Sequence, residues 1–202
     1  MRVTGVIQAG GRSVRMGGDP KALLDLGGRS IIERVVRVIR EVVDDVVVVT
    51  NTPDRYAFLG LRMIPDVFPD GGSLGGIYSG LAAASGDAAF TVACDMPFLR
   101  PEVARLVVGR AGEADVIVPR AAGQLQALHA LYAKACLPII EERVRGRRLK
   151  IADFFDAVRT LEIPETEIAR HADPAVVFMN VNTLEELAVA RTLAAREDAR
   201  GR

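Results

Sequence analysis

Short apolar runs that alternate with amphipathic segments constrain the fold of this chain more than any other feature. Residues 3–9 and 88–94 form apolar runs, and residues 45–50 read DVVVVT, which is almost entirely β-branched. Strands without polar alternation are typical of parallel sheets, whose two faces are both covered by helices. Residues 30–43 instead carry apolar side chains at three- and four-residue spacing, which predicts a helix with Ser30 as its N-cap.

The same alternation continues to the end of the chain. Helical patterns cover residues 53–59, 73–85, 102–110, 134–145, 149–157 and 184–195, the last with Thr183 as its cap. Strand patterns cover residues 61–65, 115–119, 126–132, 158–163 and 176–181. No proline- or serine-rich linker and no internal repeat divides the chain. We therefore predict one α/β domain over residues 1–196, a three-layer α/β/α Rossmann-like fold with a mostly parallel sheet, and a charged tail over residues 197–202.

Composition excludes several classes of protein. The 26 basic residues balance 26 acidic ones, which predicts that no nucleic acid is a partner. The two cysteines, Cys94 and Cys136, form no C-x-x-C pair, so neither a disulfide framework nor a zinc site is indicated. The chain starts without a signal-peptide pattern and contains no apolar window long enough to cross a bilayer. We expect a cytoplasmic protein with no membrane partner.

A glycine-rich stretch, VIQAGGRSVRMGGDPKALLDLGG, follows the first predicted strand over residues 6–28. Ligands of parallel α/β sheets bind at this carboxyl edge. Gly10 and Gly11 allow a turn with exposed N–H groups, and Arg15 and Lys21 add charge suited to a triphosphate. The spacing excludes both the P-loop and the Gly-x-Gly-x-x-Gly fingerprint of dinucleotide-binding folds. From these residues alone, a surface loop with solvated basic side chains remains the alternative.

Polar residues also stand at the ends of three further predicted strands. Asn51 follows the second strand, Asp66 the third, and Asp95 the strand at residues 88–94. A carboxylate at this edge suits Mg²⁺, which binds carboxylate oxygen together with substrate phosphates and water. Each residue could instead serve only a turn or a helix cap. Four polar positions on one edge, the loop included, favour a ligand site.

The sequence of the glycine-rich loop resembles the signature of the nucleotidyltransferase superfamily. In that superfamily an arginine and a lysine, which correspond to Arg15 and Lys21 here, hold the phosphates. Four more segments resemble the molybdenum cofactor guanylyltransferases: PDGGSLGGIYSGL, ACDMPFL, LHALY and FMNVNTLEEL. This resemblance implies a nucleotide-diphospho-sugar transferase type of fold. It also implies transfer of GMP from GTP to the terminal phosphate of molybdopterin, with Mg²⁺ as cofactor and pyrophosphate as the other product.

The resemblance further implies roles for individual residues. The catalytic residues are Arg15, Lys21 and Asp95. The residues implied to contact the nucleotide or the substrate are Gln8, Ala9, Gly10, Gly11, Lys21, Asn51, Asp66, Asp95, Asn180 and Asn182. Asp95 is the metal ligand, and the two asparagines near the C-terminus lie close to the metal and the pterin. The family usually has leucine where Gln8 stands, and a main-chain contact is independent of that side chain.

Alternative functions stay open at this point. They are a cytidylyltransferase acting on the same cofactor, a cobinamide-phosphate guanylyltransferase, a sugar-phosphate nucleotidyltransferase and a non-catalytic nucleotide-binding module. The presence of Arg15, Lys21 and Asp95 together disfavours the non-catalytic module. Proteins of molybdenum cofactor biosynthesis, or proteins that accept the product, are expected partners.

Three other features are expected to be structural. His129 lies in an apolar run and is read as a core or groove residue with satisfied hydrogen bonds, not as a catalytic base. Cys94 is read as simply buried. The basic run RVRGRRLK, residues 143–150, is read as a solvated helix end, with a surface for the anionic pterin phosphate as the alternative.

Overall fold

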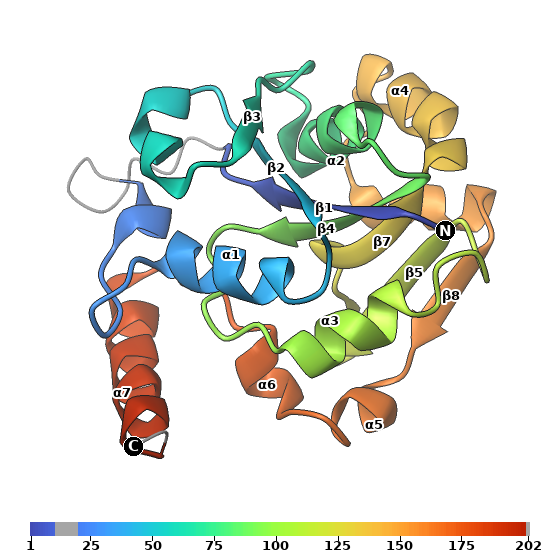
Figure 1. Cartoon of the computed structure of the whole chain (residues 1–202). Helices are drawn as coiled ribbons and strands as arrows, with labels where there is room; N and C mark the ends of the chain where they lie inside the picture. The colour runs from blue at the N-terminus through green and yellow to red at the C-terminus, as the bar shows by residue number, and fades with distance from the viewer. Residues whose placement is uncertain (11–19, 201–202) are drawn as a thin grey trace.

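A mixed eight-stranded sheet forms the centre of the molecule (Figure 1). The structure is a computed structural model that describes residues 1–10 and 20–200. The strand order is β3-β2-β1-β4-β7-β5-β6, with β8 beside β5. The strands are β1 (Val3–Gln8), β2 (Asp45–Val49), β3 (Arg62–Ile64), β4 (Ala88–Ala93), β5 (Val116–Ala121), β6 (Gln124–Leu125), β7 (His129–Ala133) and β8 (Thr160–Ile163).

Most of the strands run in one direction, as the sequence predicted. β1 pairs in parallel with both β2 and β4, β2 with β3, and β5 with β8. β7 is antiparallel to β4 and β5, and β6 is antiparallel to β5. The register places the last residues of four neighbouring strands in one row, in the order Ile64, Val49, Gln8 and Ala93. The segments that leave these four strands therefore begin side by side.

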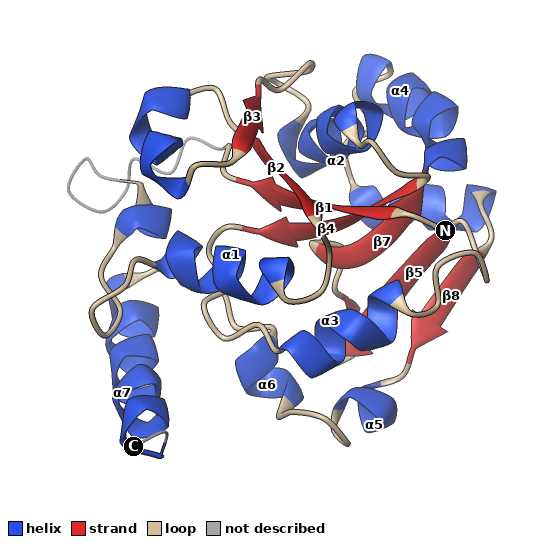
Figure 2. Cartoon of the chain, in the orientation of Figure 1, coloured by secondary structure: helices blue, strands red, loops and turns tan. Residues whose placement is uncertain are grey.

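Helices cover both faces of the sheet and complete the predicted three layers (Figure 2). The α-helices are α1 (Ile31–Arg40), α2 (Gly72–Ala83), α3 (Pro101–Val108), α4 (Leu137–Arg145), α5 (Glu165–Ile168), α6 (Pro174–Val177) and α7 (Leu184–Arg200). The 3₁₀ helices are η1 (Lys21–Leu23), η2 (Pro53–Leu59), η3 (Lys134–Cys136) and η4 (Ile151–Ala157). α1 and α3 lie on one face of the sheet, and α2 and α4 lie on the other.

Local hydrogen bonds explain where two of the predicted helices begin. The N–H and the hydroxyl of Ser30 donate to the Glu33 carboxylate at 2.7 and 2.6 Å, which holds the first turn of α1. Thr183 and Glu186 exchange two hydrogen bonds in the same way at the start of α7, since each backbone N–H donates to the other residue's side chain. Both expected caps are therefore confirmed.

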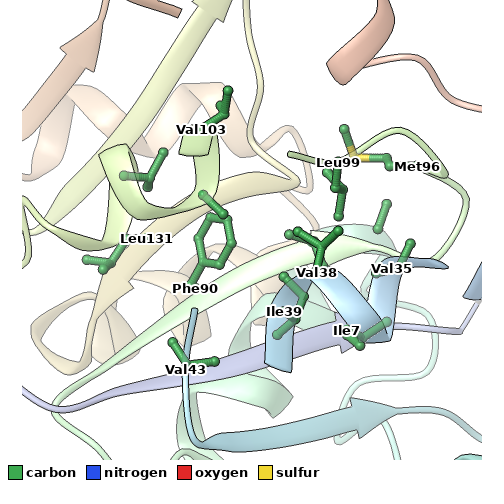
Figure 3. Close-up of a cluster of buried hydrophobic side chains, with 14 of the residues drawn as sticks. Ile7, Val35, Val38, Ile39, Val43, Phe90, Met96, Leu99, Val103 and Leu131 are labelled. Carbon is green, nitrogen blue, oxygen red and sulfur yellow. The ribbon is translucent and has the colours of Figure 1, made fainter. Parts of the chain in front are cut away.

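Alternate residues of each central strand point to opposite faces of the sheet. Ile7 and Phe90 are fully buried against α1 and α3 (Figure 3). Val6, one position earlier than Ile7, is buried on the other face against α2. A Cβ atom on Gly80 of α2 would lie 2.2 Å from a methyl carbon of Val6, so the helix rests directly on β1. This close contact fixes where α2 begins relative to the row of strand ends.

The prediction of a strand over residues 176–181 is wrong. Pro174 begins the short helix α6 instead, and the Asp173 carboxylate caps it by accepting the Ala175 N–H at 3.0 Å. Residues 178–182 then run without regular structure. Val177, Phe178 and Val181 of this run are buried without belonging to the sheet, and a short apolar run looks the same in both situations.

Three boundaries also differ from the sequence expectation. The strand expected over residues 126–132 begins only at His129, because residues 122 and 123 turn with positive φ and pair β6 with β5. The helix expected over residues 149–157 is the 3₁₀ helix η4. α7 continues to Arg200, beyond the helix expected over residues 184–195, and Glu197 in this extension forms an ion pair with Arg100. None of the helices in the described part of the chain is long and apolar enough to span a membrane.

Candidate active site

A pocket of about 180 Å³ opens beside the row of strand ends. It lies between the ends of β1 and β2 and the first turns of α2. Its lining residues are Gln8, Gly10, Val49, Asn51, Asp66, Pro69, Gly72, Ser73 and Gly76. Four residues that the sequence assigned to nucleotide binding therefore share one pocket: Gln8, Gly10, Asn51 and Asp66. Ala9 lies within the same segment of chain, where its N–H donates to the Val49 carbonyl at 2.9 Å.

Asn51 and Asp66 are held in fixed orientations at the wall of this pocket. The Asn51 side-chain oxygen accepts the Asp66 N–H at 2.9 Å. One oxygen of the Asp66 carboxylate accepts the Ser79 hydroxyl at 2.8 Å and the Phe68 N–H at 3.0 Å. Among the described residues, nothing hydrogen-bonds the Asn51 side-chain NH₂ or the second Asp66 oxygen. One donor and one acceptor are thus free to meet a ligand.

Gln8 is the last residue of β1, and its side chain lies on the α2 face of the sheet. Its side-chain NH₂ donates to the Ser73 carbonyl at 3.2 Å, and the residue is 8% exposed. The absence of a side chain at Gly76 makes room for it, since a Cβ there would lie 2.5 Å from the Gln8 Oε1. The small residues of α2 therefore allow close approach.

A second group of predicted residues lies beside the first. Lys21 is in η1, and its ammonium donates to Asn182 Oδ1 at 3.2 Å. The Val181 N–H donates to the Asp95 carbonyl at 3.0 Å, which ties the segment before α7 to the end of β4. The Cys94 N–H donates to the Gln8 carbonyl at 3.1 Å and joins the two groups. Lys21 is only 9% exposed.

Asp95 is the carboxylate of this second group. Burial raises its pKa, and the negative charge of Glu186 raises it further, whereas its own N–H and the charge of Lys21 act in the opposite direction. Burial also raises the pKa of the neighbouring Cys94 thiol to about 12, so Cys94 is no thiolate nucleophile at neutral pH. The geometry therefore presents a partly desolvated carboxylate beside a buried cation.

A divalent cation fits the donors at this position. The Asp95 carboxylate makes no ion pair or side-chain hydrogen bond with another described residue, so its oxygens are free to bind one. No group of three or more His, Cys, Asp or Glu residues that could hold a metal occurs within residues 1–10 and 20–200. A single carboxylate is the arrangement expected when substrate phosphates and water complete the shell of a hard cation. Asn180 lies in the segment tied to Asp95, and its side-chain NH₂ turns back to the Phe178 carbonyl at 3.4 Å.

Two predicted site residues, Gly11 and Arg15, lie outside the described residues. Other residues take part without having been predicted. Ser79 holds Asp66, the Ser73 carbonyl holds Gln8, and Glu186 acts on the pKa of Asp95. These partners could not be predicted from the sequence, because they depend on tertiary packing.

Two features expected to be structural lie away from this site. His129 is fully buried between the rings of Phe90 and Phe178, each 5.1 Å away, and burial lowers its pKa to about 3. It is a core residue as expected, but both ring nitrogens lack a partner among the described residues, so the expectation of satisfied hydrogen bonds is wrong. The basic run forms the exposed end of α4, where Arg145 and Arg148 pair with glutamates of the same helix.

Known proteins match the chain over nearly its whole length. The family model described as "MobA-like NTP transferase domain" matches residues 5–159. A protein of Pelotomaculum thermopropionicum named "Probable molybdenum cofactor guanylyltransferase" is 42% identical over 96% of this chain and 94% of its own length. The "Molybdenum cofactor guanylyltransferase" of Desulfosudis oleivorans is 40% identical over 92% of each chain.

A solved structure shares the fold. The molybdopterin-guanine dinucleotide biosynthesis protein A of Archaeoglobus fulgidus superposes with a TM-score of 0.81 at 23% identity, covering 96% of this chain and 99% of its own. The family model covers more than half of this chain, and both relatives match it over more than nine tenths of its length. The chain belongs to the MobA-like NTP transferase family.

Proposed function

We propose that this protein transfers GMP from GTP to the terminal phosphate of molybdopterin, forming molybdopterin guanine dinucleotide and pyrophosphate. The observation that carries the proposal is the juxtaposition of the pocket at Gln8, Asn51 and Asp66 with the polar group of Lys21, Asp95 and Asn182. The first can receive a nucleotide base, and the second can receive its phosphates. The names of the relatives support the same reaction.

The reaction requires little proton transfer. An oxygen of the molybdopterin phosphate forms a bond to the α-phosphorus of GTP, and the bond from that phosphorus to the bridging oxygen of the β-phosphate breaks. The attacking oxygen already carries negative charge, so no strong general base is needed. Catalysis then depends on holding two anions together and on stabilising the charge that moves to pyrophosphate.

The chain's own residues divide this work. Lys21 is held by Asn182 with its ammonium available for a phosphate oxygen, and we assign Arg15 the same charge-stabilising role on the grounds of the family resemblance. Asp95 would hold the divalent cation, for which we propose Mg²⁺. When bound, this cation would neutralise phosphate charge and orient the α-phosphate. Asn180 and Asn182 are proposed to face the pterin substrate.

Nucleotide-dependent thermal unfolding tests the proposal. We expect GTP with Mg²⁺ to raise the Tm, with CTP, ATP and NAD giving clearly smaller shifts at the same concentration. A shift with CTP but not GTP would overturn the choice of base and favour a cytidylyltransferase. The absence of any response to nucleoside triphosphates would overturn the assignment of a nucleotidyltransferase. The cytoplasmic location and the protein partners expected from the sequence remain predictions.

A further inference from the structure

The side chain of Gln8 occupies an unusual position for a strand residue. It is almost completely buried, yet its carboxamide forms part of the wall of the nucleotide pocket. Its NH₂ group donates to the Ser73 carbonyl at 3.2 Å. Its oxygen accepts no hydrogen bond from a described residue. This oxygen lies 2.5 Å from the position that a Cβ atom on Gly76 would take. The pocket wall therefore carries an accessible acceptor that has no partner among the described residues.

The orientation of this carboxamide is fixed by its surroundings. Rotating the group to exchange its oxygen and nitrogen would bring two acceptors, Gln8 Oε1 and the Ser73 carbonyl, against each other. The hydrogen bond to Ser73 would be lost at the same time. The oxygen is therefore the atom that Gln8 presents to a ligand, and it is presented before the ligand arrives.

The unpartnered atoms of the pocket form a recognisable set. Asn51 offers a donor in its NH₂ group, while Asp66 and Gln8 each offer an acceptor oxygen. The Watson–Crick edge of guanine carries one acceptor, O6, followed by two donors, N1–H and the 2-amino group. Adenine instead carries a donor, its 6-amino group, followed by the acceptor N1. One donor and two acceptors in the pocket match the three groups of guanine, whereas this edge of adenine offers only one donor for the two acceptors.

We propose that the Gln8 side chain selects guanine, its Oε1 accepting a hydrogen bond from the N1–H and 2-amino side of the base. This inference rests on the proposed function and names a specificity residue for it. The role differs from a main-chain contact, because it depends on the carboxamide and is lost in an apolar side chain. With adenine bound, the same oxygen would face N1 or the C2–H group, neither of which donates the hydrogen bond that guanine offers there, and such a mismatch is what makes polar pockets selective.

Nucleotide binding by two variants of Gln8 tests the proposal. Calorimetric titration with Mg²⁺ and either GTP or ATP gives the ratio of the two affinities for the wild type, Gln8→Leu and Gln8→Glu. Gln8→Leu removes the acceptor and is expected to lower the GTP-to-ATP ratio about three- to tenfold, as for loss of one hydrogen bond. Gln8→Glu keeps an acceptor oxygen but cannot donate to Ser73, and we expect it to retain most of the ratio.

The ratio separates selection from general damage to the pocket. An equal loss of GTP and ATP affinity in Gln8→Leu would overturn the inference, because it would mean that the side chain only supports α2. A loss of selectivity in Gln8→Glu as large as in Gln8→Leu would also overturn it, because the bond to Ser73 would then set the preference. The Tm without nucleotide verifies that each variant is folded. If the wild type does not prefer GTP over ATP, the proposed function itself fails. If the wild type prefers GTP but both variants keep its GTP-to-ATP ratio, only the inference about Gln8 fails.

Discussion

Lys21 and Asn182 are 161 positions apart, yet the Lys21 ammonium donates to the Asn182 side-chain oxygen at 3.2 Å. Lys21 lies in a segment after the first strand, and Asn182 lies two residues before the last helix, α7. This contact, together with the bond from the Val181 N–H to the Asp95 carbonyl, brings the segment after the first strand and the segment before the last helix to the same edge of the sheet. The proposed phosphate site is therefore complete only when the C-terminal segment has docked.

Lys21→Met should remove activity while leaving the fold intact. Methionine preserves an unbranched apolar stem of similar size in a buried position, but it removes the charge that we assign to the phosphates. We expect GMP transfer to fall about 100-fold or more, the loss typical of removing one electrostatic stabiliser. The initial rate of pyrophosphate release measures this, and the Tm should change by only a few degrees.

Lys134→Met is the matched control for this variant. Lys134 is exposed and directly follows β7, which runs against β4, so it lies at the opposite edge of the sheet. Its loss should leave transfer unchanged. Comparable activity of the Lys21→Met protein and this control would remove Lys21 from the mechanism.

The Asp95→Asn variant should be more stable than the wild type in the absence of ligand, and it should also be inactive. Burial raises the pKa of Asp95 in the folded state, so the stability associated with its proton is present below the ordinary value of 3.8 and is lost as the pH rises through the raised value. At neutral pH the carboxylate therefore opposes folding, and asparagine relieves this cost. We expect a higher Tm than wild type near pH 7, and a difference that narrows as the pH falls toward 3.8.

Added Mg²⁺ and GTP should reverse the order of the two Tm values. The wild type gains stability by binding both, whereas the Asp95→Asn protein lacks the proposed cation ligand and gains less. Asp44→Asn, at an exposed position just before β2, is the control and should behave as wild type. A cation-dependent gain of equal size in the Asp95→Asn protein would exclude Asp95 as the metal ligand.

The His129→Leu variant should lose less stability than the wild type as the pH falls. His129 titrates near its ordinary value of 6.5 when unfolded but at about 3 when folded, so the unfolded chain binds the additional proton between these values. Stability therefore falls as the pH drops below 6.5, by about 2 kcal/mol near pH 5 for a shift in this range. Chemical denaturation across a pH series should show this slope in wild type and a smaller one in the variant.

His171→Leu serves as the control, since His171 is the only other histidine and is exposed. It should keep the wild-type pH dependence. We also expect His129→Leu to be more stable near neutral pH, because it removes two buried nitrogens without partners. Identical acid slopes in all three proteins would mean that His129 is hydrated or hydrogen-bonded in solution.

Gly80→Ala should destabilise the fold although alanine is the better helix former. A Cβ at this position would lie 2.2 Å from a Val6 methyl carbon, so α2 would have to move off β1. Overpacking of this kind costs roughly 1–3 kcal/mol, more than the helix propensity of alanine returns. Urea denaturation measures the loss. Ala82→Leu adds a larger group at an exposed position of the same helix and should change stability little; an unchanged midpoint in Gly80→Ala would show that α2 does not rest on Val6.

The parts of the fold that depend on local pattern could be predicted from the sequence. The apolar run at β2 and the capped, three- and four-spaced pattern of α1 each determine one element, and both lie where expected. The polar residues after the strands could be placed on one edge, because parallel strands end together. Asn51 and Asp66 share a pocket for this reason.

The rest depends on contacts between distant segments. The run at residues 176–181 is apolar because it docks against the sheet, and periodicity does not distinguish docking from pairing. Lys21 is buried with its ammonium on Asn182, and the Ser73 carbonyl orients the side chain of Gln8. No spacing in the sequence predicts either of these contacts. The unsatisfied nitrogens of His129 likewise follow from its position between Phe90 and Phe178.

The central claim is that this chain joins the GMP moiety of GTP to molybdopterin. The most direct measurement incubates the purified protein with molybdenum-bound molybdopterin, Mg²⁺ and GTP labelled at the α-phosphate, and then separates the pterin products. We expect the label to appear in molybdopterin guanine dinucleotide, pyrophosphate to be released in equal amount, and α-labelled CTP to give little product. Label transferred from CTP in preference to GTP, or from neither, would mean that this chain is not a molybdenum cofactor guanylyltransferase.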